Sequence, residues 1–237
     1  MSSSTPYKLF QYVDKSRSII LDMLEDRGFN VSNYRNNTMD EIKTMLIAQQ
    51  SNNYTTKADI GPLDIFVKKN SVTGTSEEKL LVKYRLDAKF KERENLVSQI
   101  NDIYTTILDK NDCLIILNIY RVISKVAMQG AKTDGGSDEY SRQLYISKGY
   151  FVQFFGLENF LFNVSKHQFV PKHTIATKEE ITAMMTHYNI KNVKNLPTIK
   201  WQDPQAKYIG LKPKMITKIY GFSATTGESI RYRLCVL

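Results

Sequence analysis

Two histidines near the middle of the chain, His167 and His173, are close enough in sequence to suggest a metal or catalytic site. Imidazole binds metals and titrates near neutral pH. They lie on either side of Val170-Pro171, with Lys166 beside the first and Lys172 beside the second. Their spacing fits neither a helical i, i+4 pair nor a zinc-finger pattern, and no cysteine lies close in sequence. We therefore predict no metal or cofactor site here and interpret both histidines as structural residues at a junction between two domains.

A second pattern imitates the active site of metal-dependent nucleases. Pro62-Leu63-Asp64 is followed by Asp87-Ala88-Lys89 at the end of a strand-like run. In such enzymes two carboxylates hold Mg²⁺, and a lysine positions or activates the attacking water. Asp-x-Lys is also common in charged proteins, and a strand that leads into a charged helix explains it without catalysis. A Mg²⁺-dependent nuclease that uses Asp64, Asp87 and Lys89 is therefore an alternative hypothesis.

Nucleophilic and phosphate-binding motifs are missing from the sequence. It contains no Gly-x-Ser-x-Gly elbow, no Gly-x-x-x-x-Gly-Lys loop and no Gly-x-Gly-x-x-Gly fingerprint. Cys113 and Cys235 lie in apolar, strand-like surroundings, so we expect buried free thiols in a reducing compartment. The longest apolar runs are too short for a bilayer, and we see no secretory signal.

The first part of the chain has the elements of an α/β domain. These elements must position Asp64, Asp87 and Lys89 if they form a site. Apolar periodicity predicts a helix over 7–27 that ends at Gly28, and a second helix that starts at Thr38 with a capping box to Glu41. The predicted order continues with strands over 63–67 and 79–86, a helix over 90–108, a strand over 114–119, a mobile glycine-containing loop over 129–138, and a return to the sheet over 150–164.

Helix signals are sharper in the last third. Thr177 and Glu180 form a capping box before an apolar stripe. Asp203-Pro204 supplies an N-cap and a proline at the first helical position, and Gly210 ends that short helix.

The chain ends in a predicted β-hairpin, with strands over 214–222 and 229–236. In the second strand, apolar residues alternate with Arg231, Arg233 and Cys235. One face of this strand should therefore pack against the domain, and the other can present two arginines.

The positive charge is concentrated in the same part of the chain. The net charge is +9, and residues 163–237 hold 12 basic and 4 acidic residues, a net of +8; the first 162 hold 21 and 20, a net of +1. A basic unit suggests nucleic acid, an anionic surface or an acidic protein as partner. A stand-alone basic nucleic-acid-binding module is thus another alternative, with phosphate contacts and no base recognition.

The motifs from Asn163 onward resemble, in the same order, those of the smallest shared assembly subunit of multisubunit RNA polymerases. This is the fifth subunit of the eukaryotic enzymes, which has an archaeal equivalent without the N-terminal domain. The matching residues are Asn163, His167, Phe169-Val170-Pro171-Lys172-His173, Leu196-Pro197, Asp203-Pro204, Ala206, Tyr208, Gly210-Leu211-Lys212, Thr226-Gly227 and Tyr232-Arg233-Leu234-Cys235-Val236. The part before them is more weakly similar to the N-terminal jaw domain of the eukaryotic subunit, most clearly over Ser18 to Phe29.

The resemblance implies two domains and a non-catalytic role. Residues 1–162 would form an α/β jaw domain, a nuclease-like mixed sheet with flanking helices, and 163–237 a small α+β assembly domain. The chain would be present once per polymerase, docked on the largest subunit within the core, without cofactor, metal or membrane. Its jaw would lie beside downstream duplex DNA.

The resemblance also implies contact residues and a cellular setting. Contacts with the largest subunit are expected from His167, Pro171, Lys172, His173, Asp203, Pro204, Gly210, Leu211, Lys212, Arg231 and Arg233. Arg121 and Lys125 would lie closest to DNA, in weak and non-specific contact. We expect much of the +8 to face acidic surface on the largest subunit. The protein would be intracellular, in the nucleus if cellular. If viral, it would be in the virion and the host cytoplasm. The divergence of the sequence from the family favours a viral origin.

Overall fold

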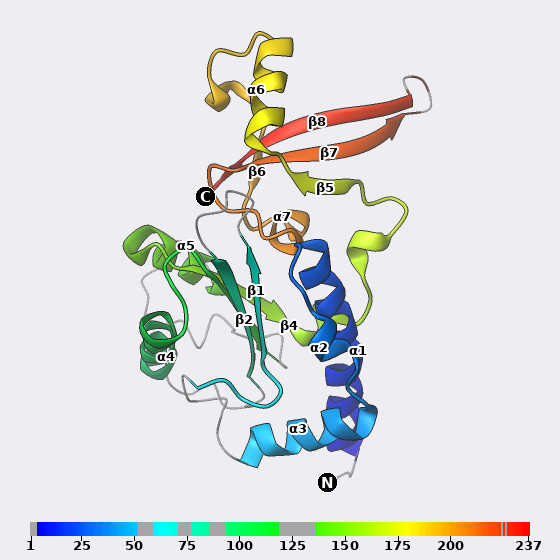
Figure 1. Cartoon of the computed structure of the whole chain (residues 1–237), viewed down its shortest axis with the longest axis vertical. Helices are drawn as coiled ribbons and strands as arrows, with labels where there is room; N and C mark the ends of the chain where they lie inside the picture. The colour runs from blue at the N-terminus through cyan, green and yellow to red at the C-terminus, as the bar shows by residue number, and fades with distance from the viewer. Residues whose placement is uncertain are drawn as a thin grey trace. The chain divides into compact units, whose positions relative to one another are not determined.

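The computed structural model describes residues 4–51, 59–70, 77–85, 93–118, 136–223, 225 and 227–237. They belong to two compact units, Met1–Phe162 and Asn163–Leu237 (Figure 1). Across these described residues, no helix is both long and apolar enough to cross a membrane. Each unit has its own sheet.

The first unit is a mixed four-stranded sheet with helices. Its strands follow the order β1-β2-β3-β4, with β1 antiparallel to β2 and the other two pairs parallel. The elements are α1 (Ser4–Asp26), α2 (Ser32–Arg35), α3 (Met39–Ser51), β1 (Ile65–Asn70), β2 (Glu77–Arg85), α4 (Arg93–Thr106), β3 (Cys113–Asn118), α5 (Gly136–Lys148), β4 (Phe151–Gly156) and the 3₁₀ turn η1 (Leu157–Phe160).

The two faces of this sheet are buried by different helices. Every residue of β3 is buried, because the strand lies between β2 and β4 and is covered on both sides. On one face, Leu114 and Ile116 pack with apolar residues of α4 and α5. On the other face, Arg27 of the α1 C-terminus donates a hydrogen bond of 2.9 Å to Gln153 of β4.

Local signals set the ends of the helices in this unit. Gly28, with φ of +86°, follows α1, and Phe29 N donates to Leu24 O, so the helix ends where the glycine predicted. The capping box at α3 is confirmed, since Thr38 N donates to the Glu41 carboxylate and Glu41 N donates to the Thr38 hydroxyl.

One helix contradicts the expected order of elements. α5 begins at Gly136, inside the stretch predicted to be a surface loop; residues 129–135 of that stretch lie outside the described residues. The glycine stands at the helix start and not in its interior. Asp138 and Glu139 follow in the first turn, where acidic side chains favour the helix N-terminus. For residues 136–138, the loop predicted from glycine content is therefore wrong.

The second unit is a small α+β fold. Its sheet has the order β5-β7-β8-β6, with β8 antiparallel to β7 and parallel to β6. The elements are η2 (Val164–Lys166), β5 (Lys172–Ile175), α6 (Lys178–His187), η3 (Val193–Asn195), β6 (Thr198–Lys200), α7 (Pro204–Tyr208), β7 (Ile216–Ser223) and β8 (Gly227–Val236). Met184 of α6 and Ile216 of β7 share a core cluster to which Tyr232 and Leu234 of β8 add.

Candidate functional site

The start of the stretch from Asn163 to His173 is bonded to α7 through Asn163 and Ser165. Asn163 caps η2 by accepting from Ser165 N, and its amide donates to the Tyr208 hydroxyl at 3.3 Å. Ser165 in turn donates its hydroxyl proton to Gln205 of α7 at 3.2 Å. The side chains at the start of this unit are thus positioned by hydrogen bonds within the unit.

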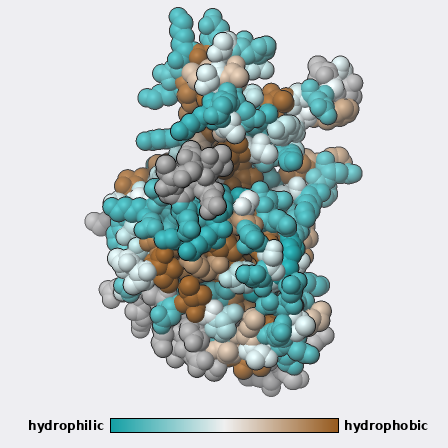
Figure 2. Space-filling model, viewed as in Figure 1, coloured by the Kyte–Doolittle hydropathy of each residue, from teal (hydrophilic) through white to brown (hydrophobic). Residues whose placement is uncertain are grey.

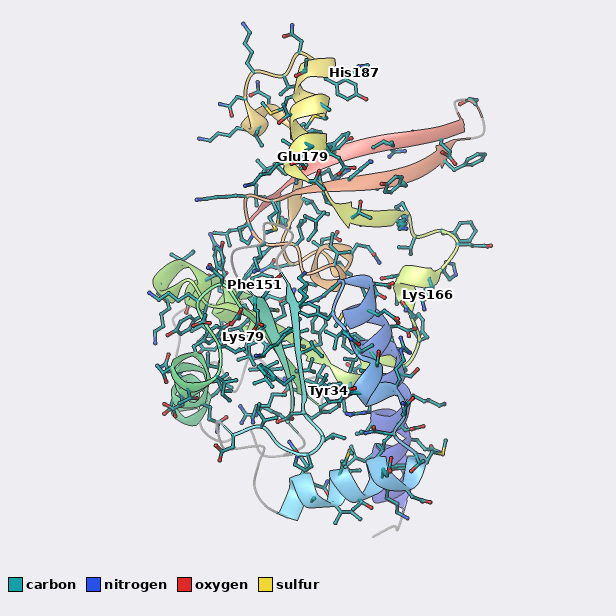
Figure 3. All side chains as sticks on the ribbon, in the orientation of Figure 1. Tyr34, Lys79, Phe151, Lys166, Glu179 and His187 are labelled. Carbon is teal, nitrogen blue, oxygen red and sulfur yellow. The ribbon has the colours of Figure 1, made fainter. Side chains whose placement is uncertain are left out.

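The three histidines lie on separate elements. His167 accepts a hydrogen bond from Phe169 N, and the His173 ring lies 2.7 Å from Pro171 O, so each organises its own turn. His187 ends α6, and Figure 3 shows it at the opposite end of that helix from Glu179. Among the described residues, no cluster of three or more histidines, cysteines or carboxylates could hold a metal.

The segment from Asp203 to Lys212 builds the short helix α7 and its exit. Asp203 accepts from Gln205 N at 2.9 Å and Ala206 N at 3.3 Å, and Pro204 occupies the first turn. Gly210 turns the chain with φ of +70°, and Leu211 is fully buried. The side chain of Leu211 therefore packs inside this unit, and its contact with the largest subunit stays a prediction.

The β7–β8 hairpin presents two different faces. Paired residues share a face, so Arg231 and Arg233 lie with Ile219 and Thr217, while Ile230 and Tyr232 lie with Tyr220 and Lys218. Both arginines are exposed, as predicted. The arginine face becomes buried further along the strand, at Cys235.

The apolar face is covered only near its base. α6 packs over Tyr232 and Leu234, but Ile230 is 45% exposed, Tyr220 39% and Phe222 80%. Figure 2 shows a largely hydrophilic molecular surface with apolar side chains in small patches on the viewed face. The sequence correctly predicted the alternation, but it did not indicate that the packed face ends before Ile230.

An ion pair joins α6 to this hairpin. Lys218 Nζ lies 3.0 Å from Glu180 Oε1 and 5.0 Å from the centre of the Tyr220 ring. The Glu180 carboxylate raises the pKa of Lys218, and the Lys218 ammonium lowers the pKa of Tyr220. Glu180 also completes the predicted capping box with Thr177, so one carboxylate fixes both the helix start and the strand beside it.

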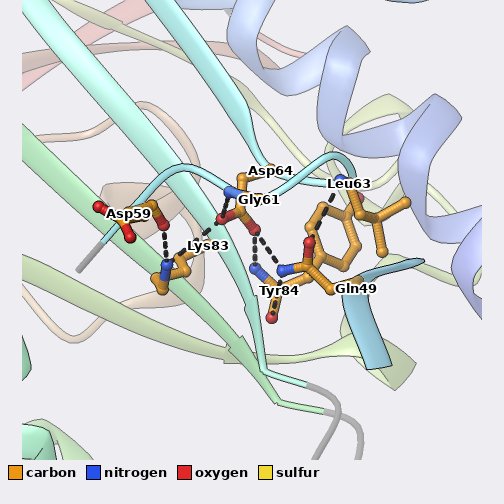
Figure 4. A network of polar contacts seen from close by, with 7 residues as sticks. All are labelled: Gln49, Asp59, Gly61, Leu63, Asp64, Lys83 and Tyr84. Atoms are coloured by element: carbon orange, nitrogen blue, oxygen red, sulfur yellow. Dashed lines mark hydrogen bonds and ion pairs between the residues drawn. The ribbon is translucent and has the colours of Figure 1, made fainter. Parts of the chain in front are cut away.

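The carboxylate of the nuclease hypothesis, Asp64, lies in a buried polar network of the first unit (Figure 4). It accepts from Gly61 N at 2.8 Å, Tyr84 N at 2.9 Å and Gln49 Nε2 at 3.2 Å. Lys83 Nζ lies 3.4 Å from Asp64 Oδ2 and donates to Asp59 O at 2.7 Å. Both oxygens of Asp64 thus already have protein donors.

Burial dominates the electrostatics of this pair. The side chains of Asp64 and Lys83 are 0% and 2% exposed. Desolvation raises the pKa of Asp64 and lowers the pKa of Lys83, and each charge opposes the shift of the other. The arrangement joins the start of β1 to β2, and we interpret it as structural.

The other residues of that hypothesis, Asp87 and Lys89, lie outside the described residues, as do Arg121 and Lys125. Lys83, the partner of Asp64, was not among the residues that the nuclease pattern indicated. The signal in the sequence was Lys83 within the otherwise apolar run Leu80–Tyr84, because a buried lysine needs a carboxylate or carbonyl partner.

The sequence of the second unit is similar to known proteins. The family described as RNA polymerase Rpb5, C-terminal domain, matches residues 162–235. DNA-directed RNA polymerase subunit Rpo5 of Archaeoglobus fulgidus is 45% identical over 75 residues, which are 32% of this chain and 97% of that protein. Its counterpart in Methanocaldococcus jannaschii is 41% identical over 31% of this chain and 92% of its own length. These proteins are subunits of RNA polymerases.

A longer match extends into the first unit. DNA-directed RNA polymerases I, II, and III subunit rpabc1 of Dictyostelium discoideum is 34% identical over 140 residues, 59% of this chain and 66% of that protein. The chain spans a smaller part, 41%, of the corresponding Caenorhabditis elegans subunit. The chain belongs to the family of the fifth RNA polymerase subunit, Rpb5 in eukaryotes and Rpo5 in archaea, as its motifs predicted.

Proposed function

We propose that the chain is a non-catalytic structural subunit of a multisubunit DNA-directed RNA polymerase. The observation that carries this proposal is that 75 and 73 residues of the chain match nearly the whole of two archaeal subunits that bear that name, while the family model matches residues 162–235. In this role the unit Asn163–Leu237 docks on the largest subunit of the polymerase core, one copy per complex. Such a subunit acts inside the cell, wherever its polymerase transcribes.

The docking surface that we propose consists of the exposed residues among those predicted to contact the largest subunit. His167, Pro171, Lys172, Arg231 and Arg233 are exposed, and His173 and Lys212 are partly buried. Asp203, Pro204 and Gly210 act indirectly, because they shape α7. The +8 charge of this unit favours acidic surface on the partner, which would set the orientation and rate of association.

For the first unit we propose the position of a lower jaw beside downstream DNA. Its near-neutral charge suits a weak, non-specific contact, with Arg121 and Lys125 as the nearest cations. Viral origin stays a prediction, since the relatives named above come from eukaryotes and archaea.

Affinity capture of the tagged full-length chain from its native source tests the proposal. We expect the two large catalytic polymerase subunits to be recovered with it. Arg231→Glu with Arg233→Glu should reduce their recovery, because both cations lie on one exposed strand face. Lys191→Glu with Lys194→Glu is the matched control, since it makes the same charge change at exposed positions of the same unit. Absence of the large subunits from wild-type captures would refute the subunit role.

A further inference from the structure

Among the described residues, the outer side of β8 is an open sheet edge over most of its length. β8 pairs with β7 along its whole length, but β6 pairs only with Leu234, Cys235 and Val236 on the other side. No strand among the described residues covers Gly227–Arg233 on that side. Figure 1 shows the hairpin extending well past β6. Seven residues are enough for a strand of ordinary length.

The hydrogen-bonding groups on this edge follow from the strand pattern. The N–H and C=O of Cys235 bond to the β7 side, to Met215 O and Lys214 N. Leu234 N instead donates to Pro197 O, and Val236 O accepts from Trp201 N, both on the β6 side. Because the direction alternates along a strand, the N–H and C=O groups of Glu228, Ile230 and Tyr232 point to the open edge.

The side chains along the edge are segregated by face. Arg231 and Arg233 lie on one face, with Arg233 Nη1 donating to Thr198 O at 3.4 Å. Ile230 and Tyr232 lie on the other face, next to the exposed ring of Tyr220. Glu228 lies on that face nearer the hairpin tip, and Lys218, which is ion-paired with Glu180, lies opposite Tyr232. A strand added here would place alternate side chains beside two cations and beside an apolar row.

We propose that Gly227–Arg233 of β8 receives an extended segment of a neighbouring polymerase subunit, in which acidic residues alternate with apolar ones. The acidic side chains would face Arg231 and Arg233, and the apolar ones would face Ile230 and Tyr232. Strand addition of this kind takes affinity from the main chain and specificity from alternate side chains. The identity of the partner as a polymerase subunit rests on the proposed function; the chemistry of the segment rests on the edge itself.

Hydrogen exchange measured by NMR on the full-length chain tests this edge directly. The probe is a synthetic peptide of alternating glutamate and valine, and the control is its lysine–valine counterpart. We expect the amides of Glu228, Ile230 and Tyr232 to exchange more slowly with the first peptide only. The amides of Ser229 and Arg231 should be unchanged, because β7 already pairs with them. Unchanged exchange at the three outward amides, or an equal response to both peptides, would overturn the proposal.

Proline substitution separates main-chain pairing from side-chain contact. Ile230→Pro removes one outward N–H and leaves the bonds to β7 intact, since proline is tolerated where the missing donor faces outward. Ile230→Val keeps that N–H and a β-branched side chain. We expect the proline variant to bind the glutamate–valine peptide about fivefold more weakly than the valine variant. Equal affinities would contradict strand addition.

A variant in which both arginines are replaced by glutamate tests the side-chain contacts without a proline in the hairpin. Arg231→Glu with Arg233→Glu should bind the lysine–valine peptide in preference to the glutamate–valine peptide, and an unchanged preference would refute the proposed register. Capture experiments then distinguish the two proposals. Loss of the large polymerase subunits from wild-type captures refutes the subunit role. Their recovery at equal levels with Ile230→Pro and Ile230→Val refutes only the added strand.

Discussion

Replacing Lys83 by methionine should destabilise the first unit strongly. Methionine fills a similar volume but leaves the Asp64 carboxylate, 0% exposed, without its cation. Breaking a buried pair by removing one partner typically costs about 3–5 kcal/mol. We expect about 3 kcal/mol, the lower end, because Asp64 keeps its bonds from Gly61, Tyr84 and Gln49. For a unit of this size, that corresponds to a fall in Tm of about 6–12 °C.

The pH dependence of this variant has a definite sign. Burial already raises the pKa of Asp64 above its ordinary value of 3.8, and loss of Lys83 raises it further. A carboxyl whose pKa is higher in the folded than in the unfolded state binds protons more tightly when folded. Stability therefore falls as pH rises from 3.8 through the folded-state pKa. The deficit of Lys83→Met relative to the wild type should shrink as pH is lowered toward 3.8.

Urea unfolding followed by two probes measures this effect. The single tryptophan, Trp201, lies in the second unit, so its fluorescence reports that unit, while far-ultraviolet circular dichroism also reports the helices of the first. Lys83→Met should shift the dichroism transition and leave the Trp201 transition unchanged. Lys79→Met is the matched control on the same strand, because the carboxylate that it leaves unpaired, Asp109, has a 77% exposed side chain. If Lys83→Met unfolds at the wild-type midpoint, the network is not structural.

Three further outcomes follow from the same contacts. Thr177→Ala should cost the second unit about 1 kcal/mol by removing the cap of α6, whereas Thr182→Ala within that helix should be near neutral; Trp201 fluorescence during urea unfolding compares them. Burial raises the pKa of the Cys235 thiol to about 12, so iodoacetamide at about pH 8 should label Cys235 only after unfolding. Rapid labelling of Cys235 in the native protein would contradict its burial. Purified protein should not cleave labelled DNA in Mg²⁺, and cleavage abolished by Asp64→Ala would overturn the structural role of that carboxylate.

Much of the fold could be predicted because its signals are local. The capping boxes at Thr38 and Thr177 and the turn at Gly28 depend on residues within a few positions of one another. The alternation along β8 is equally local, and it correctly placed Arg231 and Arg233 on one exposed face. The change in charge near Asn163 coincides with the division between the two units.

The partners of the polar residues could not be predicted in the same way. The motif linked Asp64 to Asp87 and Lys89 along the sequence, but its cation is Lys83, which the antiparallel pairing of β1 and β2 brings close. The exposure of Ile230 likewise depends on how far α6 reaches over the hairpin. Neither the pairing of Asp64 with Lys83 nor the reach of α6 over the hairpin can be predicted from a short window of residues.

The sequence by itself determined the family, the end of α1, the capped starts of α3, α6 and α7, and the two-faced pattern of the last strand. These properties rest on motif order, capping and periodicity, which act over a few residues. Tertiary structure decided that Asp64 is paired with Lys83 inside a core and that, among the described residues, no strand pairs with the outer edge of β8 beyond β6. Both follow from which strands pair and where each pairing ends, and that depends on contacts between residues far apart in the chain.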